Sequence, residues 1–357
     1  MTTGTNIPHC KPGVWPDAIA PSRFAAHILQ STPATARVAL LGLPDDLGVK
    51  LNNGRVGAAQ GPTAFRAALA KYGVANPDPQ GVFDSLFGRD FVIKQQKKNL
   101  RYRESPAFPR VFDAGDVMPA HGSDETALHE THKRVSEASE ALVKLGLFPI
   151  AIGGGHDLTY AFVRGVAKAL DEADAAKSNF AGKRTSYGGL YFDPHLDVRE
   201  TVGSGMSFRK LLEENIVGGF AIAGFNPFVN SREHVNWFGK HGLILGSDWS
   251  STLQEDKPAW YKYLPREVRI VCSFDLDVLD QSVAPGVSAM NPCGISVDTA
   301  SKAIAAITRN PSLCCLDFME LSPPHDEGGR TARVAAHLFL VALAGLMQGA
   351  LCCDKQD

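Results

Sequence analysis

Short apolar runs alternate with helix-like segments along most of the chain. Eight of these runs end in polar or glycine-rich turns, and their apolar positions are nearly continuous rather than alternating. Continuous apolar runs are typical of strands that are buried on both faces of a parallel sheet. The predicted strands cover residues 37–43, 110–113, 148–152, 189–192, 220–223, 243–245, 268–274 and 313–318.

Three segments between these runs are expected to form helices. Residues 61–72 begin with Gly-Pro, and Pro62 fits a first helical turn. Residues 123–145 carry spaced apolar positions among charges, and residues 298–308 are expected to form a helix capped by Asp298. Strands alternating with helices predict an α/β fold with helices on both faces of a parallel sheet.

The domain organisation follows from the absence of any linker, internal repeat or charge block in the sequence. We expect one catalytic α/β domain over residues 37–357, preceded by an N-terminal extension over residues 1–36. Residues 334–353 are apolar over the length of a membrane span, but His337 and Gln348 interrupt them. We therefore expect a buried C-terminal helix. Residues 95–104 and 171–187 are predicted to be solvated surface insertions.

Composition and charge narrow the possible partners. The chain has 36 Lys+Arg against 38 Asp+Glu, a formal net charge of −2, which argues against nucleic acid or an anionic membrane as partner. The seven cysteines form no CxxC pattern, and the N-terminus does not resemble a secretory signal. We expect reduced thiols in a cytoplasmic protein, with none of them activated as a nucleophile.

Acidic residues and histidines follow four of the predicted strands. One strand leads to Asp193, His195 and Asp197, with Pro194 at its end, and another leads to Asp275 and Asp277. Residues two apart in extended chain point to the same side, so each set should converge on one face. The carboxyl ends of strands are where open α/β sheets bind ligands.

Two more strands complete this arrangement. One ends in three glycines followed by His156, and the other leads to Glu320. The four aspartates carry four negative charges, and no Lys or Arg lies within their motifs, so they need cations to remain ionised together. Two divalent ions would balance them, and ligands without sulfur suit a hard ion such as Mn²⁺. The chemistry indicated is metal-assisted hydrolysis.

Two other features have simpler interpretations. The run His129-Glu130-Thr131-His132 is not a metal motif of the HExxH type, and we expect it to form an exposed helix face. Ser204 lies in Gly-Ser-Gly without the strand–turn–helix context of a hydrolase nucleophile.

Four separated motifs resemble those of the ureohydrolase family of arginases, agmatinases and formimidoylglutamases. They are GGGHDLTY, FDPHLDVRE, SFDLDVLDQSVAPGVSA and MELSPPHDEGGRTARVAA, and an N-terminal segment, LGLPDDLGV…NNGRVGAAQGPTAFR, is similar to the same family. The resemblance implies an α/β/α domain around a mainly parallel eight-stranded sheet, with two Mn²⁺ ions per subunit. It also suggests a homo-oligomer.

The resemblance implies a role for each motif residue. One ion would be bound by His156, Asp193, Asp197 and Asp275, and the other by His195, Asp193, Asp275 and Asp277. Asp197 would carry a proton to the leaving amine, and Glu320 would hold the cationic C–N group of the substrate. The metal ligand Asp277 is expected to be a third catalytic residue.

The loop after the second metal motif bears on the substrate. Its sequence, GSGMSFR, lacks the histidine of arginases and is similar to the SGTPFR loop of formimidoylglutamases. Arg199 and Arg209 could grip the two carboxylates of N-formimino-L-glutamate, with Ser204 and Gly205 beside them. Departures from the family pattern are Pro194 for Ala, Met206-Ser207 for Thr-Pro, and Leu321-Ser322 for Leu-Asn.

The sequence leaves one expected function and two alternatives. The expected activity converts N-formimino-L-glutamate and water to L-glutamate and formamide, a step of histidine breakdown. One alternative is a guanidine-cleaving ureohydrolase that releases urea, which the missing loop histidine disfavours. The other is a non-catalytic binding or scaffold protein, which the complete ligand set disfavours.

Overall fold

The computed structural model describes residues 7–73, 108–176, 187–246, 249–252, 269–349 and 351. Its strands are β1 (Cys10–Lys11), β2 (Leu29–Gln30), β3 (Val38–Leu43), β4 (Val111–Val117), β5 (Phe148–Gly153), β6 (Tyr187–Phe192), β7 (Phe220–Ala223), β8 (Gly242–Ile244), β9 (Arg269–Asp275) and β10 (Leu313–Met319). The eight predicted strands are confirmed, with ends that shift by a few residues.

The strands form one sheet in the order β1-β4-β3-β5-β10-β9-β6-β7-β8, with β2 paired to β4. Every pairing is parallel except that of β1 with β4, which is antiparallel. The eight predicted strands thus form the mainly parallel sheet that the sequence analysis expects. The short β1 and β2 come from the expected N-terminal extension and add to one edge.

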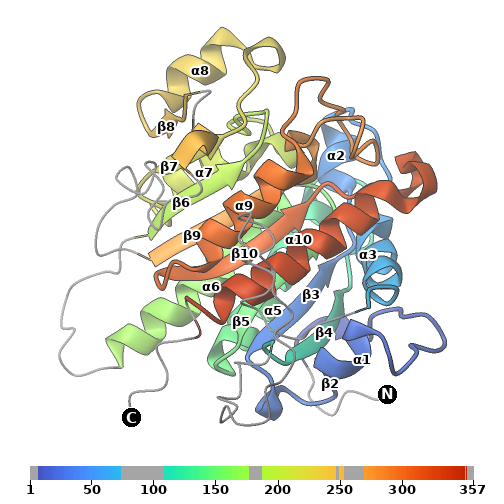
Figure 1. Ribbon diagram of the computed structural model, residues 1–357. Helices are drawn as coiled ribbons and strands as arrows, with labels where there is room; N and C mark the ends of the chain where they lie inside the picture. Colours follow the sequence, from blue (N-terminus) through green and yellow to red (C-terminus); the bar gives the residue numbers. More distant parts are fainter. Residues whose placement is uncertain are drawn as a thin grey trace.

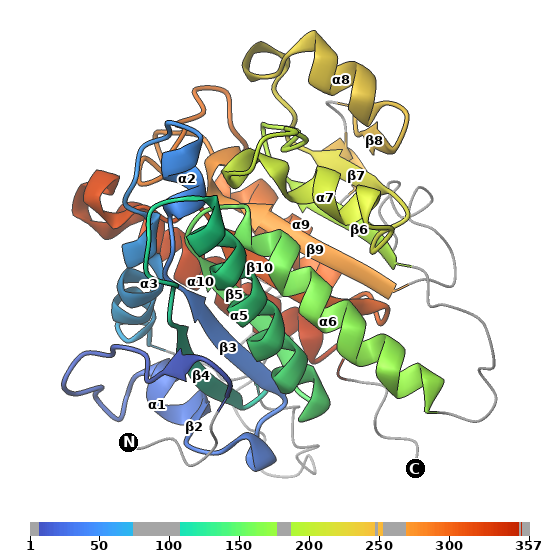
Figure 2. The same cartoon turned by 180° about the vertical axis from the view of Figure 1, so that it is seen from behind.

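Helices cover both faces of the sheet, as Figures 1 and 2 show from opposite sides. The helices are α1 (Phe24–Ile28), α2 (Leu47–Leu51), α3 (Gly61–Leu69), α5 (Glu125–Lys144), α6 (Leu158–Ala175), α7 (Ser207–Glu213), α8 (Arg232–Phe238), α9 (Val297–Thr308) and α10 (Arg330–Leu346). One apolar core joins the sheet to α1, α3, α9 and α10, and a second joins its other face to α5, α6, α7 and α8. The architecture is the predicted three-layer α/β/α fold.

The apolar C-terminal segment is a core helix. The segment Glu327–Leu346 is long and apolar enough to cross a membrane, yet 67% of the 18-residue apolar stretch within it is buried inside the protein. Helix α10 packs against α3 and α9, and Ala335, Leu338 and Phe339 are fully buried. The predicted burial is confirmed, but the helix begins at Arg330 and ends at Leu346, earlier than predicted.

The structure differs from the sequence predictions at the start of α9 and at the end of α6. Helix α9 is capped by the Ser296 side chain, which accepts a hydrogen bond from the Thr299 N–H, so the prediction of Asp298 as its cap was wrong. Asp298 instead lies in the first turn, where its negative charge interacts favourably with the positive end of the helix dipole. The expected insertion over residues 171–187 begins as the end of α6, and the insertion over residues 95–104 lies outside the described residues.

Candidate metal centre

The four strands that carry the predicted site residues are neighbours at the centre of the sheet. Their order is β5-β10-β9-β6, and all four run parallel, so their carboxyl ends lie along one edge. The Glu320 N–H donates to the Gly154 carbonyl (2.9 Å), which links the end of β10 to the turn after β5. Asp275 lies opposite Met319 in the register of β9 and β10. The strand ends therefore deliver their side chains to one place.

Local turns, and not an extended chain, aim the acidic side chains. The Asp193 carboxylate accepts from the His195 N–H (2.6 Å), and the Asp275 carboxylate accepts from the Asp277 N–H (2.8 Å). Each carboxylate thus closes a turn over its own backbone. The expectation of strand-like alternation was wrong here, because residues 193–197 lie beyond β6. Both motifs converge on one site instead of two faces.

Two histidines divide the acidic residues into two groups. His156 Nδ1 lies 3.0 Å from Asp193 Oδ2, 3.1 Å from Asp197 Oδ2 and 2.9 Å from Asp275 Oδ2. His195 Nδ1 lies 3.3 Å from both Asp193 Oδ1 and Asp277 Oδ2. Asp193 belongs to both groups and offers one carboxylate oxygen to each.

The donor atoms of these groups fit a pair of metal ions. His156, Asp193 and Asp275 form one set with ligand atoms within 4.8 Å of one another, and Asp193, His195 and Asp277 form another. His156 Nδ1, Asp193 Oδ2 and Asp277 Oδ1 are buried without a hydrogen-bond partner among the described residues. Unpartnered buried acceptors cost stability unless a cation satisfies them. Nitrogen and oxygen donors without sulfur suit a hard or borderline ion.

Burial and mutual repulsion govern the charges of these carboxylates. Burial raises the pKa of Asp275 well above its usual value, and the charge of Asp277 raises it further. Burial raises the pKa of Asp277 to about 6, although His195 opposes the change. Burial and the charge of Asp193 raise the pKa of Asp197. The fold therefore holds these acids at a cost that nearby positive charge would offset.

The histidines show the opposite balance. Burial lowers the pKa of His156, but Asp275 and the neighbouring acids outweigh it, so the pKa lies well above the usual value. The pKa of His195 is raised in the same way, with Asp277 as the main opposing charge to burial. Burial raises the pKa of Asp193, but its close contacts with His156 and His195 outweigh burial and hold it below the usual value. Without bound cations, the negative charge of the aspartates thus favours protonation of both histidines.

Glu320 lies beside this site in a strained backbone conformation. Its Oε1 accepts from the His156 N–H (2.8 Å), and its Oε2 is buried without a partner among the described residues. Burial raises its pKa to about 8, and the charge of Asp275 adds to this effect. Both Glu320 (φ 66°) and Asp197 (φ 47°) adopt left-handed conformations that non-glycine residues rarely occupy. Such strain gathers at functional sites.

Two residues that orient His156 escaped the sequence analysis. Its Nε2 lies 2.8 Å from Ser273 Oγ, and Ser273 Oγ donates to Asp317 Oδ1 (2.5 Å). Because the hydroxyl proton of Ser273 points to Asp317, its lone pair is left to accept from a protonated Nε2. This arrangement leaves Nδ1 free to bind a metal. Ser273 lies two residues before Asp275, but no spacing in the sequence connects it to His156.

The predicted substrate residues form a loop next to the metal-ligand turn. The Arg199 N–H donates to the Gly205 carbonyl (2.8 Å), and the Arg199 side chain passes so close to Gly205 that a Cβ there would lie 2.9 Å from its Cδ. Asn52, which follows α2, contacts Ser204 Oγ at 3.0 Å. Arg199 is exposed and forms no ion pair with any described residue.

Arg209 has different surroundings. Its guanidinium donates to Glu213 Oε1 (2.7 Å) and Glu200 Oε1 (2.6 Å), and it stacks 4.7 Å from the centroid of the Trp237 ring. Two carboxylates therefore already pair with Arg209, whereas Arg199 remains available to a ligand.

The run from His129 to His132 was expected to be an exposed helix face, which is wrong for half of it. His129 is exposed, but Thr131 and His132 are each 2% exposed, and His132 Nε2 lies 2.6 Å from Asp157 Oδ2. The apolar pattern of α5 did not indicate this, because a buried polar partner on another helix has no signal in the helix itself.

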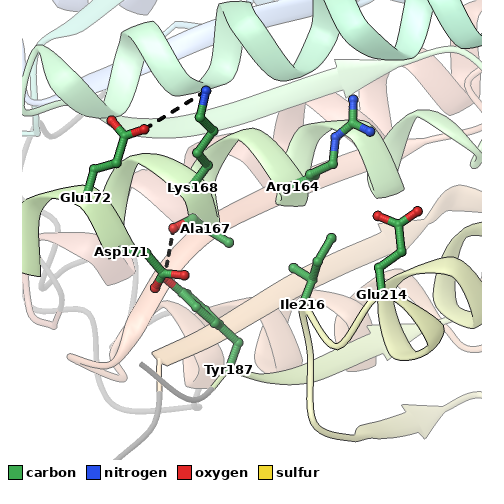
Figure 3. Close-up of a pocket in the computed structure, with 8 residues that line it drawn as sticks. All are labelled: Arg164, Ala167, Lys168, Asp171, Glu172, Tyr187, Glu214 and Ile216. Carbon is green, nitrogen blue, oxygen red and sulfur yellow. Dashed lines mark hydrogen bonds and ion pairs between the residues drawn. The ribbon is translucent and has the colours of Figure 1, made fainter. Parts of the chain in front are cut away.

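A surface pocket of about 360 Å³ lies away from these residues, beside α6 and the start of β6 (Figure 3). Its charged residues pair with one another or with nearby groups: Tyr187 donates to Asp171, Lys168 pairs with Glu140, and Tyr160 donates to Glu214. The described lining residues thus offer no convergent set of free donors like that of the metal centre.

Comparison with known proteins gives a consistent picture. The family model described as "Arginase family" matches residues 36–345. A curated formimidoylglutamase of Ralstonia nicotianae is 31% identical, with 90% of this chain and 89% of that protein covered. A formimidoylglutamase of Geobacillus thermodenitrificans is 27% identical over 87% of this chain and 85% of its own length.

Solved structures show the same likeness. The formimidoylglutamase of Bacillus subtilis is 25% identical, with a TM-score of 0.67 over 88% of each chain. The Trypanosoma cruzi formiminoglutamase solved with two Mn²⁺ ions is 26% identical, with a TM-score of 0.68 over 88% of this chain and 94% of that one.

Proposed function

The chain belongs to the arginase family, and we propose that within it this protein hydrolyses N-formimino-L-glutamate to L-glutamate and formamide with two Mn²⁺ ions. The observation that carries the proposal is the pair of ligand groups that share Asp193, on a chain whose curated relatives are formimidoylglutamases. In this reaction water adds to the amidine carbon, and the bond from that carbon to the glutamate nitrogen breaks.

We assign four ligands to each ion. One ion would be held by His156, Asp193, Asp197 and Asp275, and the other by His195, Asp193, Asp275 and Asp277. When bound, two such ions supply Lewis acidity that makes water a nucleophile at neutral pH. The six side chains carry a formal charge of −4, so two divalent ions bring the site to neutrality.

The remaining residues act on the substrate. Glu320 would accept charge-assisted hydrogen bonds from the formimino N–H groups, and its unpartnered Oε2 supports this role. Asp197 would carry a proton to the leaving amine; its side chain is 14% exposed, more than those of Asp193 and Asp275. Arg199, Ser204 and Gly205 would bind a substrate carboxylate. Arg209, which is already paired, would then mainly order the loop.

A panel of substrates tests this proposal against its rivals. The Mn²⁺-loaded protein is assayed for formamide and urea with formiminoglutamate, arginine, agmatine and guanidinobutyrate. Formamide from formiminoglutamate alone supports the proposal. Urea without formamide would replace it with a guanidine-cleaving activity, and no release from any substrate would favour a binding protein.

We also propose that the protein works in the cytoplasm as a homo-oligomer. All five cysteines in the described part of the chain are free thiols, which suits a reducing compartment. The apolar helix α10 is a core element and needs no membrane.

A further inference from the structure

A buried histidine–aspartate pair lies next to the glycine turn that presents His156. His132 on α5 and Asp157 at the start of α6 are 2.6 Å apart at Nε2 and Oδ2, and their side chains are 2% and 1% exposed. The other polar atom of each side chain, His132 Nδ1 and Asp157 Oδ1, has no hydrogen-bond partner among the described residues. Each side chain therefore depends on the other.

Asp157 is the residue next to His156, and its carboxylate fits tightly into the surrounding turn. A Cβ at Gly155 would lie 2.6 Å from Asp157 Oδ1, and a Cβ at Gly48 of α2 would lie 2.0 Å from it. The Gly155 N–H donates to the Asp45 carbonyl (2.9 Å), which closes the turn from the other side. The Asp157 carboxylate therefore lies directly against the glycine turn that presents His156, in space that is open only because residues 48 and 155 are glycines.

Stability alone does not explain the pair. Replacing a buried ion pair by apolar side chains is often neutral or stabilising, because desolvation cancels the gain from the pairing. Other contacts already join α5 to α6: Ser136 Oγ donates to the Ala161 carbonyl (2.7 Å) and Ser139 Oγ to the Phe162 carbonyl (3.1 Å). The His132 contact differs from these because it ends on the turn that presents His156.

We propose that His132 and Asp157 are positioning residues, whose hydrogen bond fixes the turn that presents His156 Nδ1 to the metal centre. This inference rests on the proposed role of His156 as a ligand. Neither residue would contact the ion. His132 holds the Asp157 carboxylate in the space beside Gly48 and Gly155, and the turn at Gly155 then sets the direction of the His156 imidazole.

Manganese binding to the metal-free protein tests this role without any substrate. The dissociation constant of Mn²⁺ is measured from the spin-resonance signal of the free ion, alongside the melting temperature. We expect His132→Phe, which keeps a ring but removes the donor, to weaken binding about 10-fold or more, as loss of outer-shell partners does. His132→Gln, which restores an N–H donor at similar reach, should recover most of the affinity.

Ser139→Ala is the matched control, because it removes a buried hydrogen bond between α5 and α6 two turns away from His132. It should lower the melting temperature and leave Mn²⁺ affinity unchanged. Should His132→Phe fail to fold, Asp157→Ala against Asp157→Asn makes the same comparison, since the Asn amide oxygen can still accept from His132.

Wild-type affinity in His132→Phe, or an equal loss in Ser139→Ala, would overturn the positioning role. Either result leaves the formamide assay untouched, so this inference and the proposed function can fail independently.

Discussion

Removing the metal should make the stability of this protein fall as pH rises. The pKa of Asp277 lies at about 6 against a usual 3.8, and that of Glu320 at about 8 against 4.5. Groups whose pKa is raised in the folded state stabilise it while they are protonated, and they lose that contribution as pH rises through the folded value. One pKa unit corresponds to about 1.4 kcal/mol, so ionising these two buried side chains costs about 3 and about 5 kcal/mol.

These costs are large compared with the usual stability of a folded domain, about 5–15 kcal/mol. Asp275 and Asp197 shift in the same direction, and so do His156 and His195, which lose their protons as pH rises. Asp193 has a lowered pKa and contributes the opposite trend, but its change falls below the usual value for an aspartate and outside this window.

The assay is urea unfolding of chelator-treated protein between about pH 5 and pH 9, with and without Mn²⁺. We expect the free energy of unfolding of the metal-free protein to fall by several kcal/mol across this range, and Mn²⁺ to restore most of it at the upper end. Asp277→Asn should reduce the slope, because it removes one titrating carboxylate. A metal-free protein whose stability is flat or rises with pH would refute the electrostatic account of the site.

Three further predictions concern single side chains. Asp277→Asn should abolish turnover and lower the Mn²⁺ content measured by metal analysis; full activity would refute the two-ion assignment. Arg199→Asn should raise KM for formiminoglutamate by about 10- to 100-fold with the Mn²⁺ content unchanged, as expected for a lost charged hydrogen bond, and an unaltered KM would exclude it from carboxylate binding. Arg66→Met should lower the free energy of unfolding by about 3–5 kcal/mol, because it leaves the carboxylates of Asp113 and Asp116, which Arg66 pairs at 2.9 and 2.6 Å, without a counter-charge. Urea unfolding measures this loss, and a change below about 1 kcal/mol would show that the network contributes little.

The sequence predicted the fold well because its signals are local. Each buried strand is largely an apolar run, and each strand of the site ends in an acidic residue or is followed within three residues by an acidic residue or a histidine. The parallel arrangement then brings Asp193, Asp275 and Glu320 to one edge without any long-range information. The residue spacing predicted an extended chain at these acids, and that prediction was wrong. The side chains of Asp193 and Asp275 are instead oriented by turns that their own carboxylates close.

The residues that support the site were not predictable in this way. Ser273 is 117 residues from His156, and His132 is 25 residues from Asp157. Their contacts depend on how α5, α6 and β9 pack, which no pattern in one element records. Arg209 illustrates the same limit, because only the packing reveals that Glu200 and Glu213 already pair with it.

The buried charge of the site also bears on whether this protein is a catalyst or a scaffold. Asp193, Asp275 and Asp277 are each at most 2% exposed, and a fold that served only as a binding surface would be no less stable with apolar side chains in their place. Strained backbone at Asp197 and Glu320 adds to the cost of keeping them. A protein that retains all these groups in destabilising surroundings trades stability for function. The function that uses every one of them is metal-assisted hydrolysis, in which bound cations offset the same charges that destabilise the metal-free fold.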